Sequence, residues 1–89
     1  MRAQLQKLLA QGRDSALLRF GLAQACLQEG DSAEAAVHLR QAVTQDPRYS
    51  AAWKLLGKAL LQQARPEEAA EAWRQGLAVA QERGDSQAV

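Results

Sequence analysis

The chain repeats itself with a period of 34 residues, and this period limits the fold more than any other feature. When the sequence is shifted by 34 positions, residues 16–47 align with residues 50–81, and nine of the 32 aligned pairs are identical. The identical pairs are Leu22/Leu56, Ala25/Ala59, Leu27/Leu61, Gln28/Gln62, Glu34/Glu68, Ala35/Ala69, Ala36/Ala70, Arg40/Arg74 and Gln41/Gln75. Chance gives roughly one match in ten for a composition of this kind. Such a period indicates stacked units that bury their apolar faces against one another.

Each copy of the repeat has the pattern of two helices joined by a tight turn. Apolar residues recur every three or four positions, and the pattern is interrupted at residues 30–32 and again at residues 64–66. After the second interruption, Trp73 and Leu77 belong to the apolar face that is expected to be buried. Helices are predicted at residues 2–11, 16–29, 33–45, 51–63 and 67–83. Ala, Leu and Gln account for 44 of the 89 residues, whereas Val, Thr and Ile together number five, so strands are nearly excluded. The sequence therefore predicts an all-α fold of about five antiparallel helices.

Residues that begin and end helices stand at the expected boundaries. The predicted N-caps are Ser15, Asp31 and Ser50. Glu34 follows Asp31 by three residues, as in a capping box, and Pro66 suits the first turn of a helix. Asp46 precedes a proline and is therefore pushed out of the helical region, which predicts the end of the helix at residues 33–45.

The repeat columns resemble those of the tetratricopeptide repeat. The second copy carries Trp53, Leu56, Gly57, Leu60, Ala69, Trp73 and Gly76 at seven of the family's columns, and the first copy carries Leu22, Ala23, Cys26, Ala35, Leu39, Ala42 and Pro47. Departures from the pattern occur at Arg19, Ala64 and Gln81. The resemblance implies helix–turn–helix repeats stacked as a short right-handed α-solenoid.

Residues 1–89 are predicted to form one domain of this kind. Repeat 1 is expected at residues 16–49 and repeat 2 at residues 50–83. The same shift of 34 places Leu5, Leu8 and Leu9 on apolar columns, so residues 2–14 are predicted to be an N-terminal capping helix. Arg83-Gly84 is predicted to end the last helix of repeat 2, and residues 84–89 to begin a truncated or frayed C-terminal helix.

The resemblance also implies how individual side chains pack. Gly57 is expected to lie against Ala69, because small residues let paired helices approach closely. Trp53 and Trp73 are expected to fill the space between helices rather than to stack on nucleic-acid bases. Three residues of the helix predicted at residues 33–45 are expected to be less buried. We expect Ala33 and Ala36 to lie nearer solvent and His38 to be half-exposed.

Composition argues against several classes of function. Eleven basic and ten acidic side chains give a net charge of +1, spread evenly along the chain, so neither nucleic acid nor an anionic membrane is an expected partner. A single cysteine cannot form an internal disulfide, the first residues are too polar for a signal peptide, and no apolar run approaches the length of a membrane span. A cytoplasmic location is therefore expected.

No group of residues in the sequence predicts catalysis or a metal site. His38 is the only histidine, and Cys26 lies on the predicted buried face of a different helix, so the two are not expected to form a nucleophile pair. Glu67, Glu68 and Glu71 open a predicted helix, where the backbone dipole favours negative charge without a metal. The sequence therefore predicts a non-enzymatic protein with no cofactor.

The resemblance implies a concave groove lined by the first helix of each pair. The residues carried onto that groove are Leu17, Phe20, Gln24, Leu27, Gln28, Lys54, Leu55, Lys58, Leu61 and Gln62. Leu17, Phe20, Leu27 and Leu61 are large apolar residues that the internal packing pattern does not require, and such residues on a surface mark interaction sites. The lysines and glutamines supply hydrogen-bond donors for a peptide. The predicted partner is thus a protein or peptide whose identity the sequence does not give.

Two further expectations concern the partner. Chaperone-binding members of the family hold a terminal carboxylate with Lys, Asn and Asn at columns that here carry Phe20, Gln24 and Leu55, so that ligand is not expected. The alternative function is structural, namely a weak homodimer formed through a C-terminal repeat that nothing covers.

Overall fold

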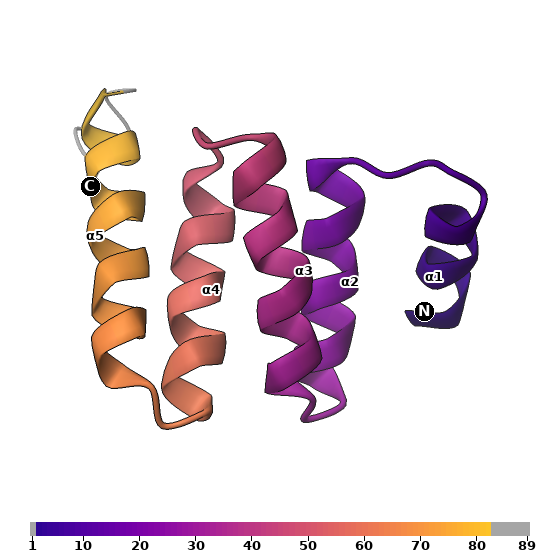
Figure 1. Cartoon of the computed structure of the whole chain (residues 1–89), viewed down its shortest axis with the longest axis horizontal. Coiled ribbons are helices and arrows are strands. Elements are labelled where there is room, and N and C mark those ends of the chain that lie inside the picture. The colour runs from indigo at the N-terminus through magenta and orange to yellow at the C-terminus, as the bar shows by residue number, and fades with distance from the viewer. Residues whose placement is uncertain (1, 83–89) are drawn as a thin grey trace.

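In the part of the chain that the structure describes, five helices lie side by side in chain order (Figure 1). The structure is a computed structural model, and it describes residues 2–82. The helices are α1 (Arg2–Ala10), α2 (Ala16–Gln28), α3 (Ser32–Gln45), α4 (Ser50–Gln62) and α5 (Pro66–Glu82). No strand occurs within this range, which confirms the predicted all-α solenoid. The helix end predicted at Arg83-Gly84 and the C-terminal helix predicted at residues 84–89 lie outside the described residues.

Both helical pairs turn in the same way. The turn after α2 contains Gly30 at φ 79°, and the turn after α4 contains Ala64, in the same repeat column, at φ 59°. The backbone N–H of the next residue donates to the carbonyl of Cys26 (2.8 Å) in the first turn and of Leu60 (3.0 Å) in the second. This left-handed residue with a bond back across the turn is a common helix ending. Ala64 adopts the conformation at a steric cost that a glycine avoids.

The cap predictions are confirmed in two of three cases. The side chains of Ser15 and Asp31 each accept a hydrogen bond of 3.1 Å from the backbone N–H three residues later. Ser50 was predicted to cap α4, and this is wrong: it is the first helical residue, and Tyr49 occupies the cap position without a side-chain bond. Pro66 is the first residue of α5, as predicted.

The buried core is thin and consists mainly of alanine. Ten of the 17 buried apolar residues are alanines, and the largest fully buried side chains are Leu22, Leu39, Leu56, Leu60 and Cys26. α3 packs against both α2 and α4, so it is covered on two sides. Ala36 and His38 are accordingly only 5% and 6% exposed, and their predicted exposure is wrong. Ala33 is exposed, as predicted.

Each tryptophan packs over a glycine of the neighbouring helix. A Cβ atom on Gly57 would lie 2.6 Å from Cε2 of Trp73 and nearer still to its Nε1, while a Cβ on Gly76 would lie 3.0 Å from Cβ of Trp53. Gly57 thus makes room for the Trp73 indole, and its expected contact with Ala69 stays a prediction. Both indole N–H groups donate to backbone carbonyls, at 3.1 Å from Trp73 to α4 and at 2.8 Å from Trp53 to the loop before α4. The indoles therefore have the packing and polar partners of structural residues.

Gly57→Ala is expected to lower the free energy of unfolding by about 1–3 kcal/mol, because the added methyl group would displace the Trp73 indole. Gly21→Ala is the control. Gly21 is also inside a helix, but a Cβ there would meet Leu5 Cδ1 at an ordinary 3.5 Å. Alanine is favoured over glycine in a helix by about 0.5–1 kcal/mol, so this variant should be more stable. Urea unfolding followed by circular dichroism measures both, and two changes of the same sign would contradict the described contact.

α1 is attached to the rest of the molecule mainly at its first turn. It has no fully buried residue and lies at one end of the row (Figure 1). Arg2 forms ion pairs with Glu29 (2.8 Å) and Asp31 (3.3 Å), which flank the turn between α2 and α3. Leu5 adds the apolar contact with α2 at Gly21.

Candidate peptide-binding groove

An open groove of about 360 Å³ lies between α2 and α4. It is lined by Gln24, Leu27, Gln28, Leu55, Lys58 and Gln62. α2 and α4 are the first helices of their pairs, and residues three or four apart on a helix share one face. The structure therefore brings six of the ten sequence-predicted residues into one groove. Their role in binding stays a prediction.

The other four predicted residues do not line this groove. Leu17 and Leu61 are 73% and 50% exposed, respectively. Lys54 lies toward α5, since its Cγ would be 3.5 Å from a Cβ on Gly76. Phe20 was expected not to be required for internal packing, but its ring stacks on Tyr49 with centroids 5.1 Å apart and packs against the core. The Phe20–Tyr49 pair thus forms a contact between α2 and the loop before α4. The role of Phe20 in binding stays a prediction.

The groove combines an apolar floor with polar walls. Leu27 and Leu55 are partly buried and pack against the core cluster, so they form the floor. The side chains of the three glutamines and of Lys58 are exposed, and none of the four has a hydrogen bond or ion pair with another described residue. Among residues 2–82, no carboxylate lines the groove. A bound peptide could therefore use three free primary amides, which both donate and accept hydrogen bonds, and one unpaired positive charge.

A second apolar surface lies on α4 and α5, in the repeat that was expected to be uncovered. Trp73 and Leu77 of α5 were expected on a buried face, yet they are 40% and 54% exposed. Leu61 of α4 lies one helical turn beyond Gly57, over which the Trp73 indole packs. Within the described residues α5 is packed against α4, and no other helix covers this side.

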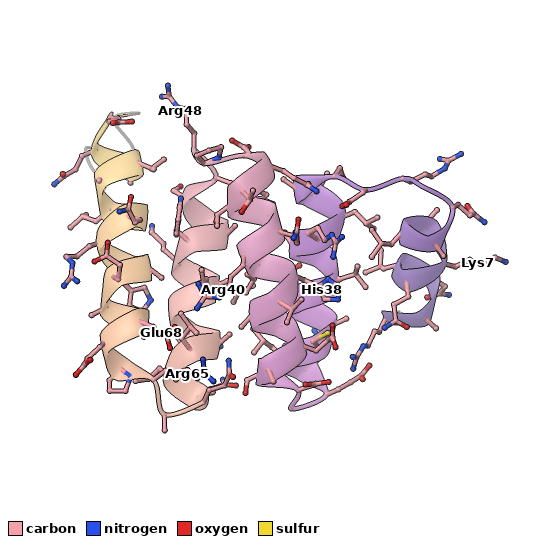
Figure 2. The ribbon with its side chains drawn as sticks, viewed as in Figure 1. Lys7, His38, Arg40, Arg48, Arg65 and Glu68 are labelled. Atoms are coloured by element: carbon pink, nitrogen blue, oxygen red, sulfur yellow. The ribbon has the colours of Figure 1, made fainter. Side chains whose placement is uncertain are left out.

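His38 and Cys26 do not form a catalytic pair. Cys26 is fully buried, and burial raises the pKa of its thiol, so it is not an activated nucleophile. His38 Nδ1 lies 3.1 Å from Arg19 Nη1, and its Nε2 lies 3.5 Å from Glu34 Oε1. An arginine can only donate, so Nδ1 accepts and the neutral ring carries its proton on Nε2. Figure 2 shows His38 between α3 and α2.

Arg19 occupies the column where the repeat pattern has tryptophan, and it organises a polar network there. Its guanidinium donates two hydrogen bonds to Asp14, at 2.8 Å from Nε and 3.0 Å from Nη2. These bonds, with a further one from Gln45, lower the pKa of Asp14 to about 2. The sequence offered only a weak signal for this network, because Asp14 and His38 are far apart along the chain.

The chain should lose stability on acidification in two separate steps. Burial lowers the pKa of His38 below its ordinary 6.5, and the Arg19 guanidinium lowers it further, whereas Glu34 raises it. A group whose folded pKa is depressed stabilises the fold while deprotonated, so His38 contributes above pH 6.5 and this contribution is lost as the pH falls. Asp14 contributes above its unfolded pKa of 3.8 and loses this as the pH falls toward 2.

His38→Asn tests the first step. Asparagine retains an acceptor for Arg19 but does not titrate, and His38 is the only histidine of the chain. The free energy of unfolding should fall between pH 7.5 and pH 5 in the unmodified chain and stay flat over that range in the variant. Below pH 4 both proteins should lose stability together through Asp14. An unchanged slope between pH 7.5 and pH 5 in the variant would contradict the assignment.

Glu68 and Glu71, two of the three acidic side chains near the start of α5, are exposed and paired with arginines. Glu68 lies 3.1 Å from Arg40 and 3.4 Å from Arg65, and Glu71 lies 2.6 Å from Arg74. Figure 2 shows Arg40, Glu68 and Arg65 together at α3 and α5. Across residues 2–82, no group of three or more histidines, cysteines and carboxylates is placed to hold a metal ion.

Residues 2–82 contain no helix that is both long and apolar enough to span a lipid bilayer.

Comparison with known proteins agrees with the repeat pattern. A family model described as tetratricopeptide repeat matches residues 27–89, and a second with the same description matches residues 2–49. The chain is also 55% identical over 84 residues to the TPR repeat-containing protein PA0015 of Pseudomonas aeruginosa, which covers 94% of this chain and 80% of that protein. The chain belongs to the tetratricopeptide repeat family. The family predicted from the repeat columns is thus confirmed.

A solved structure supports the tetratricopeptide fold. The solution structure of protein BPP2914 from Bordetella parapertussis matches with a TM-score of 0.81 and 46% sequence identity, over 98% of this chain and 76% of that one. Tetratricopeptide repeats generally mediate protein–protein interaction, and proteins built from them are typically non-enzymatic scaffolds. These statements hold for the family and name no partner for this chain.

Proposed function

We propose that the groove between α2 and α4 binds a peptide segment of a protein partner, so that the chain acts as a non-enzymatic interaction module. The observation that carries this proposal is the convergence of four polar side chains without intramolecular partners over a floor of two leucines. Buried polar groups are normally paired, whereas exposed ones that converge on a concave surface are available to a ligand. The general role of the family supports the same conclusion.

Two repeats supply only a short groove, which limits the affinity. We expect dissociation constants on the order of micromolar, well short of the nanomolar values that larger interfaces reach. The balanced charge of the chain argues against nucleic acid or an anionic membrane as the partner. The single buried cysteine fits a reducing compartment, and the cytoplasm is our proposed location.

A steric block of the groove tests this function. Random capped dodecapeptides are selected on the immobilised chain, and the selected peptides are then measured against Gln28→Cys carrying a bulky maleimide label. Cys26 is buried and should not react. The label should weaken binding about tenfold or more, because it fills the space between α2 and α4.

Gln41→Cys with the same label is the matched control, since Gln41 is exposed on α3 and does not line the groove. Its labelling should leave the affinity unchanged. If both labelled variants bind equally, or if amide chemical shifts of the selected complexes change only on α3 and α5, the groove is not the binding site.

The alternative function is self-association through the surface of α4 and α5. The observation in its favour is the exposure of Leu61, Trp73 and Leu77, three large apolar side chains on two packed helices. Contiguous apolar surface of this kind marks interaction sites or association between copies.

Sedimentation equilibrium distinguishes this alternative. If the chain dimerises through this surface, Leu77→Glu should dissociate the dimer, because a charge would be buried without a partner. Val37→Glu is the control, since Val37 of α3 is exposed to the same 54%. A chain that remains monomeric up to millimolar concentration would rule out the alternative and leave the groove function standing.

A further inference from the structure

We propose that the side of α2 on which α1 packs is a second binding surface, and that an amphipathic helix of a partner protein takes the place of α1 there. This surface, the α1 site, is formed by Gly21, Leu22 and Ala25 of α2 together with Glu29 and Asp31. None of these residues lines the groove between α2 and α4, so the α1 site is independent of the function proposed for the groove. α1 then acts as a cover that a partner helix displaces.

The part of the α1 site that lies on α2 is apolar. Leu5 of α1 reaches Gly21, since its Cδ1 would lie 3.5 Å from a Cβ there. Leu22 and Ala25 are one and four residues further along α2, and both are buried, yet neither belongs to the core cluster that α2–α5 share. α1 contributes no residue to that cluster and packs against α2 at one end of the row (Figure 1). Displacing α1 therefore uncovers apolar surface that another helix can bury.

α1 holds this site weakly. It has no fully buried residue, and with nine residues it is shorter than a helix that is stable on its own. Arg2 binds the partly exposed carboxylates of Glu29 and Asp31, and ion pairs of this kind contribute little. The Nε atom of Arg2 is also buried without a hydrogen-bond partner among residues 2–82, which weakens the contact further. The opening of α1 should therefore cost far less than the unfolding of α2–α5.

The contacts of α1 indicate which partner fits. Arg2, Leu5 and Leu9 are the half-buried residues of α1, and its other residues are exposed. Their spacing of three and four places them on one face of the helix. The fitting partner is therefore a helix with a cation in its first turn and large aliphatic side chains three and seven positions later. Glu29 and Asp31 flank the turn between α2 and α3, so they determine which end of the partner helix binds there.

α1 competes with any partner because it belongs to the same chain. Residues 11–15 join it to α2, and a linker this short gives an effective concentration on the order of millimolar. A partner must therefore bind more tightly than a free copy of α1, and a preformed helix does so because it loses less conformational entropy. A change that loosens α1 should in turn raise the affinity for the partner, since the open site is then more populated.

The test uses the full chain, labelled with ¹⁵N, and a helical copy of α1. The probe is a capped peptide of residues 2–10 with Ala3→Glu, whose new side chain is joined to Lys7 by a lactam on the exposed side of the helix. The control peptide also carries Leu5→Gln and Leu9→Gln. The probe should shift the amide signals of the α1 site and bind at least about tenfold more tightly than the control peptide, because the control lacks both aliphatic contacts.

Substitutions in the chain then test the competition. Arg2→Gln should raise the affinity for the probe about threefold or more, because it removes the ion pairs that hold α1 in place. Lys7→Gln is the matched control, since it removes the same charge from the exposed side of α1 and should leave the affinity unchanged. Glu29→Gln removes an acceptor from the site itself, so it should reduce the advantage of the probe over a probe with Gln in place of its arginine.

Amide hydrogen exchange of the free chain tests the weak attachment without a ligand. The amides of residues 7–10 should exchange at least about 100-fold faster than those in the middle of α3. Equal exchange rates would show that α1 opens only with the whole fold, and would overturn the proposal. The same conclusion would follow if the probe shifted only groove signals, or if the Arg2→Gln and Lys7→Gln chains bound it equally.

Discussion

Close approach of neighbouring helices is the constraint on which the rest of the structure depends. Alanine and glycine at the contacts let neighbouring helices approach closely. At the contact of α4 with α5, two glycines each leave room for a tryptophan of the opposite helix. A core this thin holds few large side chains, so most bulky residues lie at its margin. Leu27 and Leu55, which form the floor of the groove, lie at this margin.

The same constraint explains why the two ends of the row differ from its middle. α3 has helices on both sides and contributes six buried residues, whereas α1 contributes none. Arg2 attaches α1 through ion pairs with partly exposed carboxylates, and exposed pairs of this kind contribute little to stability. α1 therefore has few interactions that oppose its local opening, and it belongs to the least stable part of the fold.

The sequence predicted the fold better than it predicted burial. Within residues 2–82, the period of 34 residues and the turn signals placed the helix ends within about one residue, because these signals are local. The predicted end of the last helix lies outside this range. The burial of a side chain depends on how many neighbouring helices cover its own helix. The spacing of apolar residues along one helix does not give that number. Ala36 and His38 were expected nearer solvent because one apolar face was assumed for a helix that two neighbours cover. Trp73 and Leu77 show the opposite error on α5, which has a single described neighbour.

Helical geometry also explains why only part of the predicted site forms a groove. Successive residues advance by about 100° around a helix, so Gln62 lies about 40° and Leu55 about 60° to one side of Lys58. Lys54 and Leu61 lie about 40° and 60° to its other side, toward Gly57 and the α5 contact.

On α2 the side chains that face α4 lie on the opposite side in angle. Leu27 lies about 60° from Gln24 toward α4. Phe20 lies about 40° from Gln24 to the same side, where its ring stacks on Tyr49. The repeat columns assign all of these residues to the concave surface. A column gives the position of a residue in the repeat, but it does not give the angle of the side chain toward a particular neighbouring helix. The boundary between groove-facing and helix-facing side chains therefore runs between Lys58 and Lys54, two identical residues one turn apart.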